Sequence, residues 1–332
     1  MKRSLTLSLV ALWLALAGAA EAARRQAEPE APAISPARLG EARTQLYRVG
    51  AIVTAARGPC GDILAIVTLP LETPWQRVRL ISEDFSPEVA EVRYRDLSGG
   101  GARQMMVSIP RLDAGAEARA VVTCEVTTHL LAPPDESIAA ELKIPRRTPT
   151  QLKRFTGPSP MIESRSGKLK RIAKSVLADL EADGAEPTDW RKVEAIYEHV
   201  LDTIQYAEGP DTSALTTLAE GVADCHGRSA LFIALCRSIG VPARVVWVHD
   251  HAYPEFWLQG PSGDGEWYPA ESAGTRAFGE MPVARTVLQR GDSFRVPERP
   301  RERLRYASDY LTGRPLPGGG RPKVRYLREP VR

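Results

Sequence analysis

The sequence lacks the features that mark several common functional classes. Its 332 residues carry a formal net charge of only +3, which is too small to indicate nucleic acid as a partner. It contains no Gly-rich phosphate-binding loop and no basic stripe interleaved with aromatic residues. With 43% apolar and 26% charged residues, its composition is that of an ordinary globular protein. The chain can bury two cores, because a domain typically holds on the order of 100–150 residues.

The apolar run at residues 5–16 is too short to cross ~30 Å of hydrocarbon as a helix. Lys2 and Arg3 precede this run, and small residues with an Ala-x-Ala pattern follow it at 17–22. This order predicts a signal peptide at residues 1–22 and therefore export to the periplasm or the medium. No Cys follows the run, so a lipoprotein anchor is not expected. An uncleaved membrane anchor is the alternative.

Cysteine is scarce, with four residues in the chain. In an oxidising compartment, Cys60 and Cys124 could form a disulfide, and closing a loop of that length contributes ~4 kcal/mol. Cys225 and Cys236 lie eleven residues apart on one predicted helix. The rise of ~16 Å over that interval excludes a disulfide between them. No Cys-x-x-Cys or His-x-x-x-His pair is present, so the usual spacing of zinc ligands is missing.

A flexible linker is predicted at residues 23–43, and strands follow it. Alternating side chains rich in β-branched residues predict strands at 46–49, 63–69, 77–81, 92–94, 105–109 and 118–128. Short strands at this spacing indicate a β-sandwich over residues 44–150. A second linker is predicted at 151–165.

Helical periodicity begins at residue 166. It predicts one helix that ends before Gly184, a second that begins near Thr188 or Asp189, and a third from Cys225 to Gly240. Strands are predicted again at 243–248, 252–258 and 267–270. Helices packed on a short antiparallel sheet make an α+β domain over residues 166–290.

The last predicted part of the chain, residues 291–332, is basic and rich in Pro and Gly. From position 295 onward it holds eleven Lys or Arg against four acidic residues. It is predicted to be a solvated tail, and the alternative is a surface that attracts an anionic polymer of the cell envelope.

The residues around Cys225 indicate a reactive thiol. Cys225 stands at a predicted loop-to-helix junction, between Asp224 and His226. The N–H groups at a helix start are unpaired and its dipole end is positive, so this position is expected to lower the pKa of the thiol. The same N–H groups can stabilise an oxyanion on an attacked acyl carbon. Cys236, in the middle of the helix, is predicted to be an ordinary buried residue.

A nucleophilic thiol needs a base within reach, and the chain has only five histidines. Three are candidates: His226, His249 and His251. The side chain of His226 is expected to point away, because it follows the nucleophile directly on the helix. His249 and His251 are two residues apart and would share one face of a regular strand. Composition and spacing do not choose between them.

At this point the sequence resembles a family, the transglutaminase-like superfamily of papain-like fold. The pattern consists of a cysteine that opens a helix, a Gly-Val-Pro-Ala-Arg segment at 240–244, a His-Ala-Tyr-Pro-Glu strand at 251–255 and a Trp-Tyr-Pro-Ala-Glu strand at 267–271. Upstream, residues 196–200 and 204–206 are similar to the helix that precedes the active-site loop. The resemblance covers about residues 166–274.

The resemblance implies a papain-like core in which Cys225 is the nucleophile, His251 the base and Glu271 the carboxylate that orients the base. It implies an enzyme that attacks amide bonds of peptides or proteins through a thioester and needs no cofactor. Water as the second nucleophile would make it a peptidase or amidase, and a Lys amine would make it a cross-linking acyltransferase. Two positions depart from the pattern: the third residue is usually Asp, and Pro254 interrupts the strand of His251.

Two further functions are compatible with these residues. Cys225, His226, His249 and His251, with Glu271, are ligand types that suit zinc. A scaffold that keeps the fold without catalysis is the other alternative, and it predicts an ordinary thiol with a pKa near ~8.5. The loop at 211–213 precedes the Cys225 helix and either lines the cleft or merely connects two elements.

Overall fold

Antiparallel sheets form the first half of the fold, as the alternating sequence predicts. The computed structural model describes residues 34–97, 99–182 and 186–331. A four-stranded sheet has the order β15-β1-β6-β3, and a nine-stranded sheet has the order β12-β11-β10-β9-β13-β5-β2-β14, with β4 paired to β5. The strands of the β-rich first half are β1 (Leu39–Thr54), β2 (Cys60–Leu69), β3 (Gln76–Phe85), β4 (Glu91–Leu97), β5 (Ala102–Leu112) and β6 (Glu117–Leu131). All six strands predicted in this region are confirmed.

Period-two alternation explains why these strands pack as two layers. Successive side chains of a strand point to opposite faces, and the inward residues of β1, β2, β5 and β6 form one buried cluster. Cys60 and Cys124 lie in this cluster as free thiols. The disulfide that the sequence allowed is therefore not formed. The reason is that β2 and β6 belong to different sheets, which pack ~10 Å apart, whereas a disulfide needs Cα atoms within ~7 Å.

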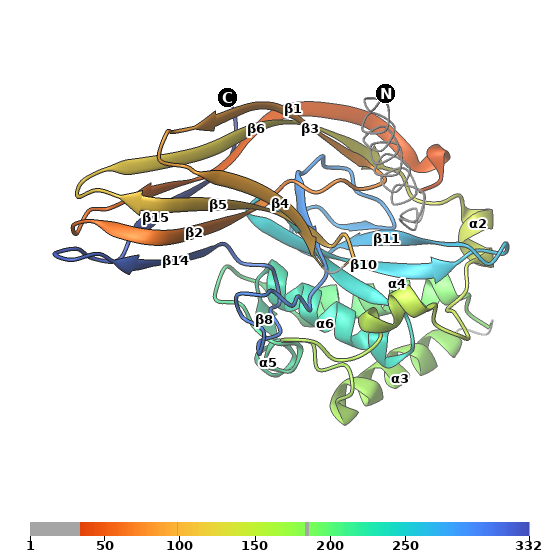
Figure 1. Cartoon of the computed structure of the whole chain (residues 1–332). Helices are drawn as coiled ribbons and strands as arrows, with labels where there is room; N and C mark the ends of the chain where they lie inside the picture. The colour runs from red at the N-terminus through yellow and green to blue at the C-terminus, as the bar shows by residue number, and fades with distance from the viewer. Residues whose placement is uncertain (1–33, 98, 183–185, 332) are drawn as a thin grey trace, which may run out of the picture. The chain divides into compact units, whose positions relative to one another are not determined.

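The second half is α+β, which confirms the predicted fold class (Figure 1). Its helices are α3 (Gly167–Glu181), α4 (Asp189–Thr203), α5 (Ala214–Glu220) and α6 (Cys225–Ser238), and its strands include β9 (Ala243–Val248), β10 (His251–Gln259) and β11 (Gly265–Glu271). Thr188 caps α4 by accepting a hydrogen bond from the Arg191 N–H. Most residues of α6 are buried, as expected of a helix whose middle, residues 230–236, is entirely apolar.

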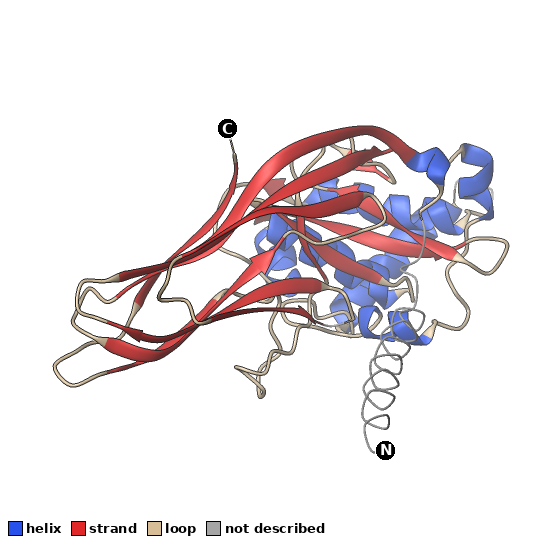
Figure 2. Cartoon of the chain, turned by 45° about the horizontal axis from the view of Figure 1, so that its top comes forward, coloured by secondary structure: helices blue, strands red, loops and turns tan. Residues whose placement is uncertain are grey.

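Helix α6 therefore lies at the centre of the core, packed against β9 and β10. Figure 2 shows the helices gathered at one end of the strands. Several short elements were not predicted, among them α2 (Glu136–Glu141) and two strands, β7 (Gln205–Tyr206) and β8 (Val222–Ala223), which pair in parallel. Strand β8 ends just before Asp224 and Cys225. Strand β12 (Ala277–Phe278) pairs with β11.

The two predicted domains are joined by a shared sheet. Strand β13 (Val287–Arg290) pairs with β9 of the core through Val287 and Val248, and with β5 of the sandwich through Gln289 and Ala102. The described residues of the chain belong to one compact unit. The sequence does not reveal this connection, because β13 has only four residues and is too short to show the alternation of a strand.

The prediction of a solvated tail at 291–332 is wrong for the second half of that range, which forms two paired strands. Strand β14 (Tyr310–Pro315) pairs with β2, and β15 (Lys323–Pro330) pairs with β1. Val324 and Tyr326 pack against the sandwich cluster, while Arg325 between them is exposed. Lys323 and Arg325 therefore occupy outward positions of an alternating strand, and composition alone concealed the alternation.

The predicted linkers also contain ordered structure. In the first, a 3-10 turn at Pro36–Arg38 leads into β1, and Arg38 is buried where it donates to the carbonyls of Ala132 and Gly279 (3.1 and 2.9 Å). In the second, a 3-10 turn at Thr150–Phe155 buries Phe155 against Trp267. The predicted signal peptide, residues 1–22, lies outside the described residues. In the part of the chain that is described, no helix has the length and apolarity needed to span a membrane.

Candidate active site

Cys225 is the first residue of α6, as the sequence predicts. The Asp224 side chain caps the helix by accepting a hydrogen bond from the Gly227 N–H at 3.0 Å. Gly227 has no room for a side chain, because an added Cβ would lie 2.2 Å from the Thr212 hydroxyl and 2.6 Å from that of Thr217. This close approach lets α5 and the preceding loop press against the first turn of α6. The position of the thiol is therefore set by tight packing on one side of the helix start.

The environment of the Cys225 sulfur raises the pKa of the thiol to about 11, contrary to the expectation from a helix start. Burial is the main cause, and the carboxylates of Asp224, Glu271 and Glu208 add to it. The backbone N–H of Ala252 bonds to the sulfur and acts in the opposite direction. Burial in an acidic setting thus outweighs the helix dipole. A thiol of this kind reacts at neutral pH only if a base takes its proton.

His251 and Glu271 form the pair that can supply such a base. His251 opens β10 and Glu271 ends β11, and the His251 Nε2 lies 2.8 Å from a Glu271 carboxylate oxygen. The other carboxylate oxygen of Glu271 accepts a hydrogen bond from the Ala273 N–H at 2.9 Å. The longer Glu side chain is accommodated because both of its oxygens have partners. Ala252, which bonds to the sulfur, directly follows His251 in the chain.

The other two histidines point to different partners. The His249 Nδ1 lies 2.8 Å from the Tyr47 hydroxyl of β1, and the ring meets Tyr47 edge-on. His249 therefore does not share the setting of His251, because it lies in the turn between β9 and β10 rather than in a regular strand. The His226 Nδ1 pairs with Asp211. Of the three candidates for the base, His251 is the one paired with Glu271.

Zinc ligation by all five proposed residues does not fit this arrangement. Within the described residues, the ligand atoms that lie within 4.8 Å of one another belong to Asp224, Cys225 and His226. His251 is instead engaged by Glu271. The His226 nitrogen nearest the group is already paired with Asp211, so a metal would have to displace that partner.

The loop at 211–213 contributes contacts that the sequence left open. Asp211 pairs with His226, Thr212 bonds to Thr217 at 2.7 Å, and Ser213 caps α5 by accepting a hydrogen bond from the Thr216 N–H. Ser213 followed by a helical stretch is a signal that could have revealed α5. The loop therefore borders the first turn of α6 rather than merely connecting two elements.

Two arginines near the thiol were not predicted as site residues. The Arg228 guanidinium donates to the carbonyls of Ser272 (2.6 Å) and Ile204, and so connects β7 to the end of β11. Arg305 comes from the predicted tail and bonds to Asp211 and to the His226 carbonyl. No periodic or spacing signal marks Arg305, because its partners lie far away in the sequence.

The remaining charged positions of the pattern form a buried network behind the site. Arg244 and Glu255 are cross-strand partners on β9 and β10 and form an ion pair. Glu255 also accepts hydrogen bonds from Arg290 at 3.0 and 3.1 Å. Burial alone would raise the pKa of Glu255, but the two arginines outweigh it and the pKa is lowered. Pro254 lies one residue beyond the stretch of β10 that pairs with β11, so it interrupts no pairing with that strand.

Comparisons with known proteins agree with this architecture. Residues 171–272 match the model of the transglutaminase-like superfamily. The fold is similar to that of a "putative cysteine protease" from Cytophaga hutchinsonii, with a TM-score of 0.53 and 16% identity over 88% of this chain and 93% of that one. A "putative protease" from Parabacteroides distasonis aligns with a TM-score of 0.27 and 14% identity, over 69% of this chain and 43% of that one. No curated protein matches the sequence.

Proposed function

We propose that this protein is a cysteine-dependent enzyme that cleaves or transfers amide bonds of peptides or proteins. Cys225 is the nucleophile, His251 the base and Glu271 the residue that orients the base. The observation that carries this proposal is the 2.8 Å contact between His251 and Glu271, next to a thiol that accepts a hydrogen bond from the Ala252 N–H. The match to the transglutaminase-like superfamily over residues 171–272 supports it.

Proton transfer from Cys225 to His251 is the first step. Because burial raises the pKa of the thiol to about 11, deprotonation must be coupled to protonation of the imidazole. The His251 Nε2 faces Glu271, so Nδ1 receives the proton. The carboxylate of Glu271 then stabilises the imidazolium and holds its orientation.

The thiolate next attacks the acyl carbon and forms a C–S bond. The carbonyl oxygen becomes an oxyanion, which N–H groups at the start of α6 can stabilise. When the intermediate collapses, the C–N bond breaks and the amine leaves with the proton from His251. The thioester is then attacked by water, which gives an acid, or by an amine, which gives a new amide. Either attack returns the thiol to its protonated state.

The experiment measures both outcomes on the full chain. Wild type is incubated with casein alone, to detect cleavage, and with casein and a fluorescent alkylamine, to detect covalent incorporation. We expect Cys225→Ala to abolish whichever activity wild type has, and His249→Ala to retain it. Activity that survives in Cys225→Ala would overturn the assignment of the nucleophile.

The same preparation tests the alternative of a non-catalytic scaffold. Alkylation of Cys225 by iodoacetamide is followed against pH. A midpoint clearly below ~8.5, the value of an ordinary thiol, supports the enzyme, and a midpoint at or above that value favours the scaffold. Zinc bound in stoichiometric amount to purified protein would favour the metal site instead.

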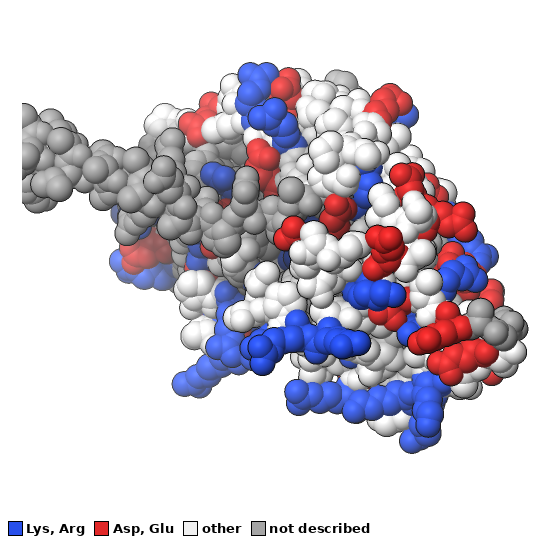
Figure 3. All heavy atoms as spheres, turned by 90° about the vertical axis from the view of Figure 1, so that its right-hand side faces the viewer, with Lys and Arg blue, Asp and Glu red and all other residues white. Residues whose placement is uncertain are grey.

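We further propose that the protein is exported and that its basic surface contacts an anionic polymer of the cell envelope. The basic residues of 291–332 are one part of this surface. Another part is a groove beside the start of α4, which Lys143, Arg146 and Arg147 line. Figure 3 shows Lys and Arg side chains along the lower part of the face at the right of Figure 1, with Asp and Glu side chains above and beside them. Attraction of this kind is screened by salt, so cosedimentation with cell-envelope polymer should fall as ionic strength rises.

A further inference from the structure

The segment between β13 and β14 reaches the start of α6, although it lies outside the region that matches the family model. Its Arg305 side chain is only 6% exposed. The guanidinium donates to Asp211 at 2.9 Å and to the His226 carbonyl at 3.1 Å. His226 directly follows the nucleophile. A residue from the predicted tail thus contacts the first turn of the helix that carries Cys225.

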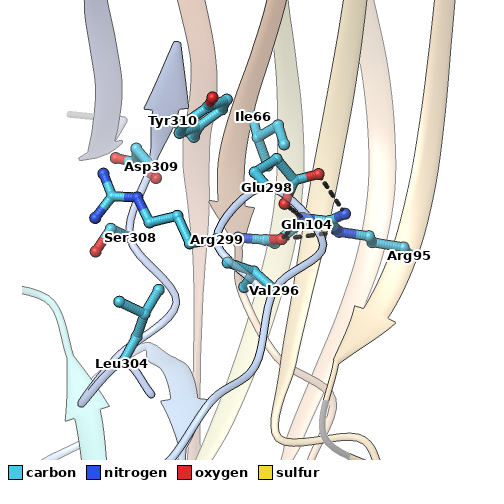
Figure 4. Close-up of a pocket in the computed structure, with 10 residues that line it drawn as sticks. All are labelled: Ile66, Arg95, Gln104, Val296, Glu298, Arg299, Leu304, Ser308, Asp309 and Tyr310. Carbon is cyan, nitrogen blue, oxygen red and sulfur yellow. Dashed lines mark hydrogen bonds and ion pairs between the residues drawn. The ribbon is translucent and has the colours of Figure 1, made fainter. Parts of the chain in front are cut away.

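Contacts on both sides of Arg305 fix the segment in place. Before it, Glu298 pairs with Arg95 of β4 at 2.8 and 2.7 Å. After it, the Ala307 N–H and carbonyl bond to Gln289 of β13 at 2.7 and 3.1 Å, and Asp309 accepts from the Thr68 N–H at 3.1 Å. Figure 4 shows Glu298 and Asp309 projecting from this segment toward the strands of the sandwich. The sandwich therefore anchors the segment that delivers Arg305.

The Arg305 guanidinium contacts Asp211 and Trp247, which also hold the ring of His226 beside the nucleophile. The two oxygens of Asp211 are divided between Arg305 and His226. The His226 ring packs against Trp247 at 5.3 Å, and the guanidinium lies over the same indole at 5.2 Å. This arrangement fixes the His226 ring, one nitrogen of which lies within 4.8 Å of the Cys225 sulfur, and it fixes the backbone at the His226 carbonyl.

Arg305 also brings a positive charge into an acidic setting. The charged and titratable groups that face Cys225 or its first turn come from six parts of the fold: Asp224, His226, Tyr206, Glu208, Asp211, His251, Glu271 and Arg305. Burial lowers the pKa of Arg305, and Asp211, Asp224, Asp292 and Cys225 oppose that lowering. An arginine remains protonated in proteins, so its charge is present throughout the range in which a thiol titrates.

We propose that Arg305 is a positioning residue of the active site, which holds the first turn of α6 through Asp211 and the His226 carbonyl and places a positive charge beside Cys225. The inference rests on the proposed function, because it assigns the charge to a nucleophile. It makes the C-terminal segment a part of the site rather than a tail. Loss of the charge should disfavour the thiolate form of Cys225.

The test is the pH dependence of Cys225 alkylation, measured by mass spectrometry of the peptide that contains Cys225. We expect Arg305→Met to move the midpoint upward and so to slow alkylation at neutral pH. Arg305→Lys keeps the charge and should stay closer to wild type. Arg303→Met, an exposed arginine of the same segment, is the matched control and should leave the midpoint unchanged.

The outcomes separate this inference from the proposed function. A midpoint in folded Arg305→Met equal to that in Arg303→Met would overturn the role of Arg305 alone. If the Met variant does not fold, Arg305→Gln, which keeps a donor but loses the charge, gives the same comparison. A wild-type midpoint near 11 that does not respond to His251→Ala would instead overturn the proposed function. Because alkylation requires no substrate, the measurement is decisive even before a substrate is known.

Discussion

At the scale of single residues, the proposed coupling between Cys225 and His251 would decide whether the thiol is reactive. Burial and neighbouring carboxylates raise the pKa of the Cys225 thiol to about 11, so the helix start alone does not activate it. The Glu271 carboxylate lies 2.8 Å from the His251 imidazole and holds its orientation. The thiolate and the imidazolium are therefore expected to form together.

This coupling makes a sharp prediction for His251→Ala. Without the imidazole, the alkylation midpoint of Cys225 should rise above that of wild type, because burial and the nearby carboxylates then oppose the thiolate with no proton acceptor beside it. His249→Ala, whose ring lies against Tyr47, should keep the wild-type midpoint. Titration of iodoacetamide reactivity against pH measures both variants. Equal midpoints in the two variants would show that His251 does not act on the thiol.

The sequence nominated Cys225, His251 and Glu271 by a pattern of ordered short segments, and the roles of these residues remain predictions. What it could not anticipate is the balance of charge around them. The helix start predicted a lowered thiol pKa, but that argument ignored burial, which is the main cause of the raised pKa, and the carboxylates of Glu271 and Glu208, which approach from other elements. Arg305 could not be nominated at all, because tertiary contacts alone bring it to His226.

At the scale of elements, β9 and β10 are joined by more than their backbone ladder. Glu255 is 1% exposed and is paired with both Arg244 and Arg290. The Arg244 guanidinium also lies 3.9 Å from the centre of the Trp267 ring on β11. The Glu255 carboxylate therefore connects β10 to β9 and β13, and Arg244 extends this network to β11. Strands β10 and β11 carry His251 and Glu271.

Glu255→Gln should destabilise the protein strongly, because it leaves two buried arginines without a counter-charge. Breaking a buried pair in this way typically costs about 3–5 kcal/mol. The matched control is Glu125→Gln, which removes the partner of the largely exposed Arg79 and should cost less than about 1 kcal/mol. Denaturant unfolding of the two variants at pH 7 gives the comparison. Equal losses would contradict the structural importance of the network.

The same network predicts how the difference depends on pH. The arginines lower the pKa of Glu255 below its unfolded value of ~4.3. A group with a lowered folded pKa stabilises the protein above the unfolded value and loses that contribution as pH falls through the folded value. The gap between wild type and Glu255→Gln should therefore be complete at pH 7 and shrink below about pH 4.

Long elements with a clear period were predictable, whereas short ones were not. Helices α3, α4 and α6 each have 14 or 15 residues, which gives several turns of apolar periodicity. Helix α5 has seven residues and β13 has four, so neither repeats its pattern often enough. These short elements nevertheless position the site, since α5 presses on the first turn of α6 and β13 joins the core to the sandwich.

At the scale of the whole molecule, the C-terminal strands close the sheets that support the site. Strand β15 covers the edge of β1, and β14 covers the edge of β2. The 291–309 segment between β13 and β14 carries Arg305 and is held to the sandwich by Glu298 and Asp309. The sandwich thus supports the active site through a segment that sequence composition assigned to a tail.

This organisation predicts opposite outcomes for neighbouring substitutions in β15. Val324 packs against the sandwich cluster, so Val324→Asp would place an unpaired charge in an apolar setting and cost at least about 2 kcal/mol. Arg325→Asp, at the adjacent exposed position, should change the free energy of unfolding by no more than about 0.5 kcal/mol. Chemical denaturation measures both. If β15 were a solvated tail, the two substitutions would be equally harmless, because neither side chain would be packed against the sandwich.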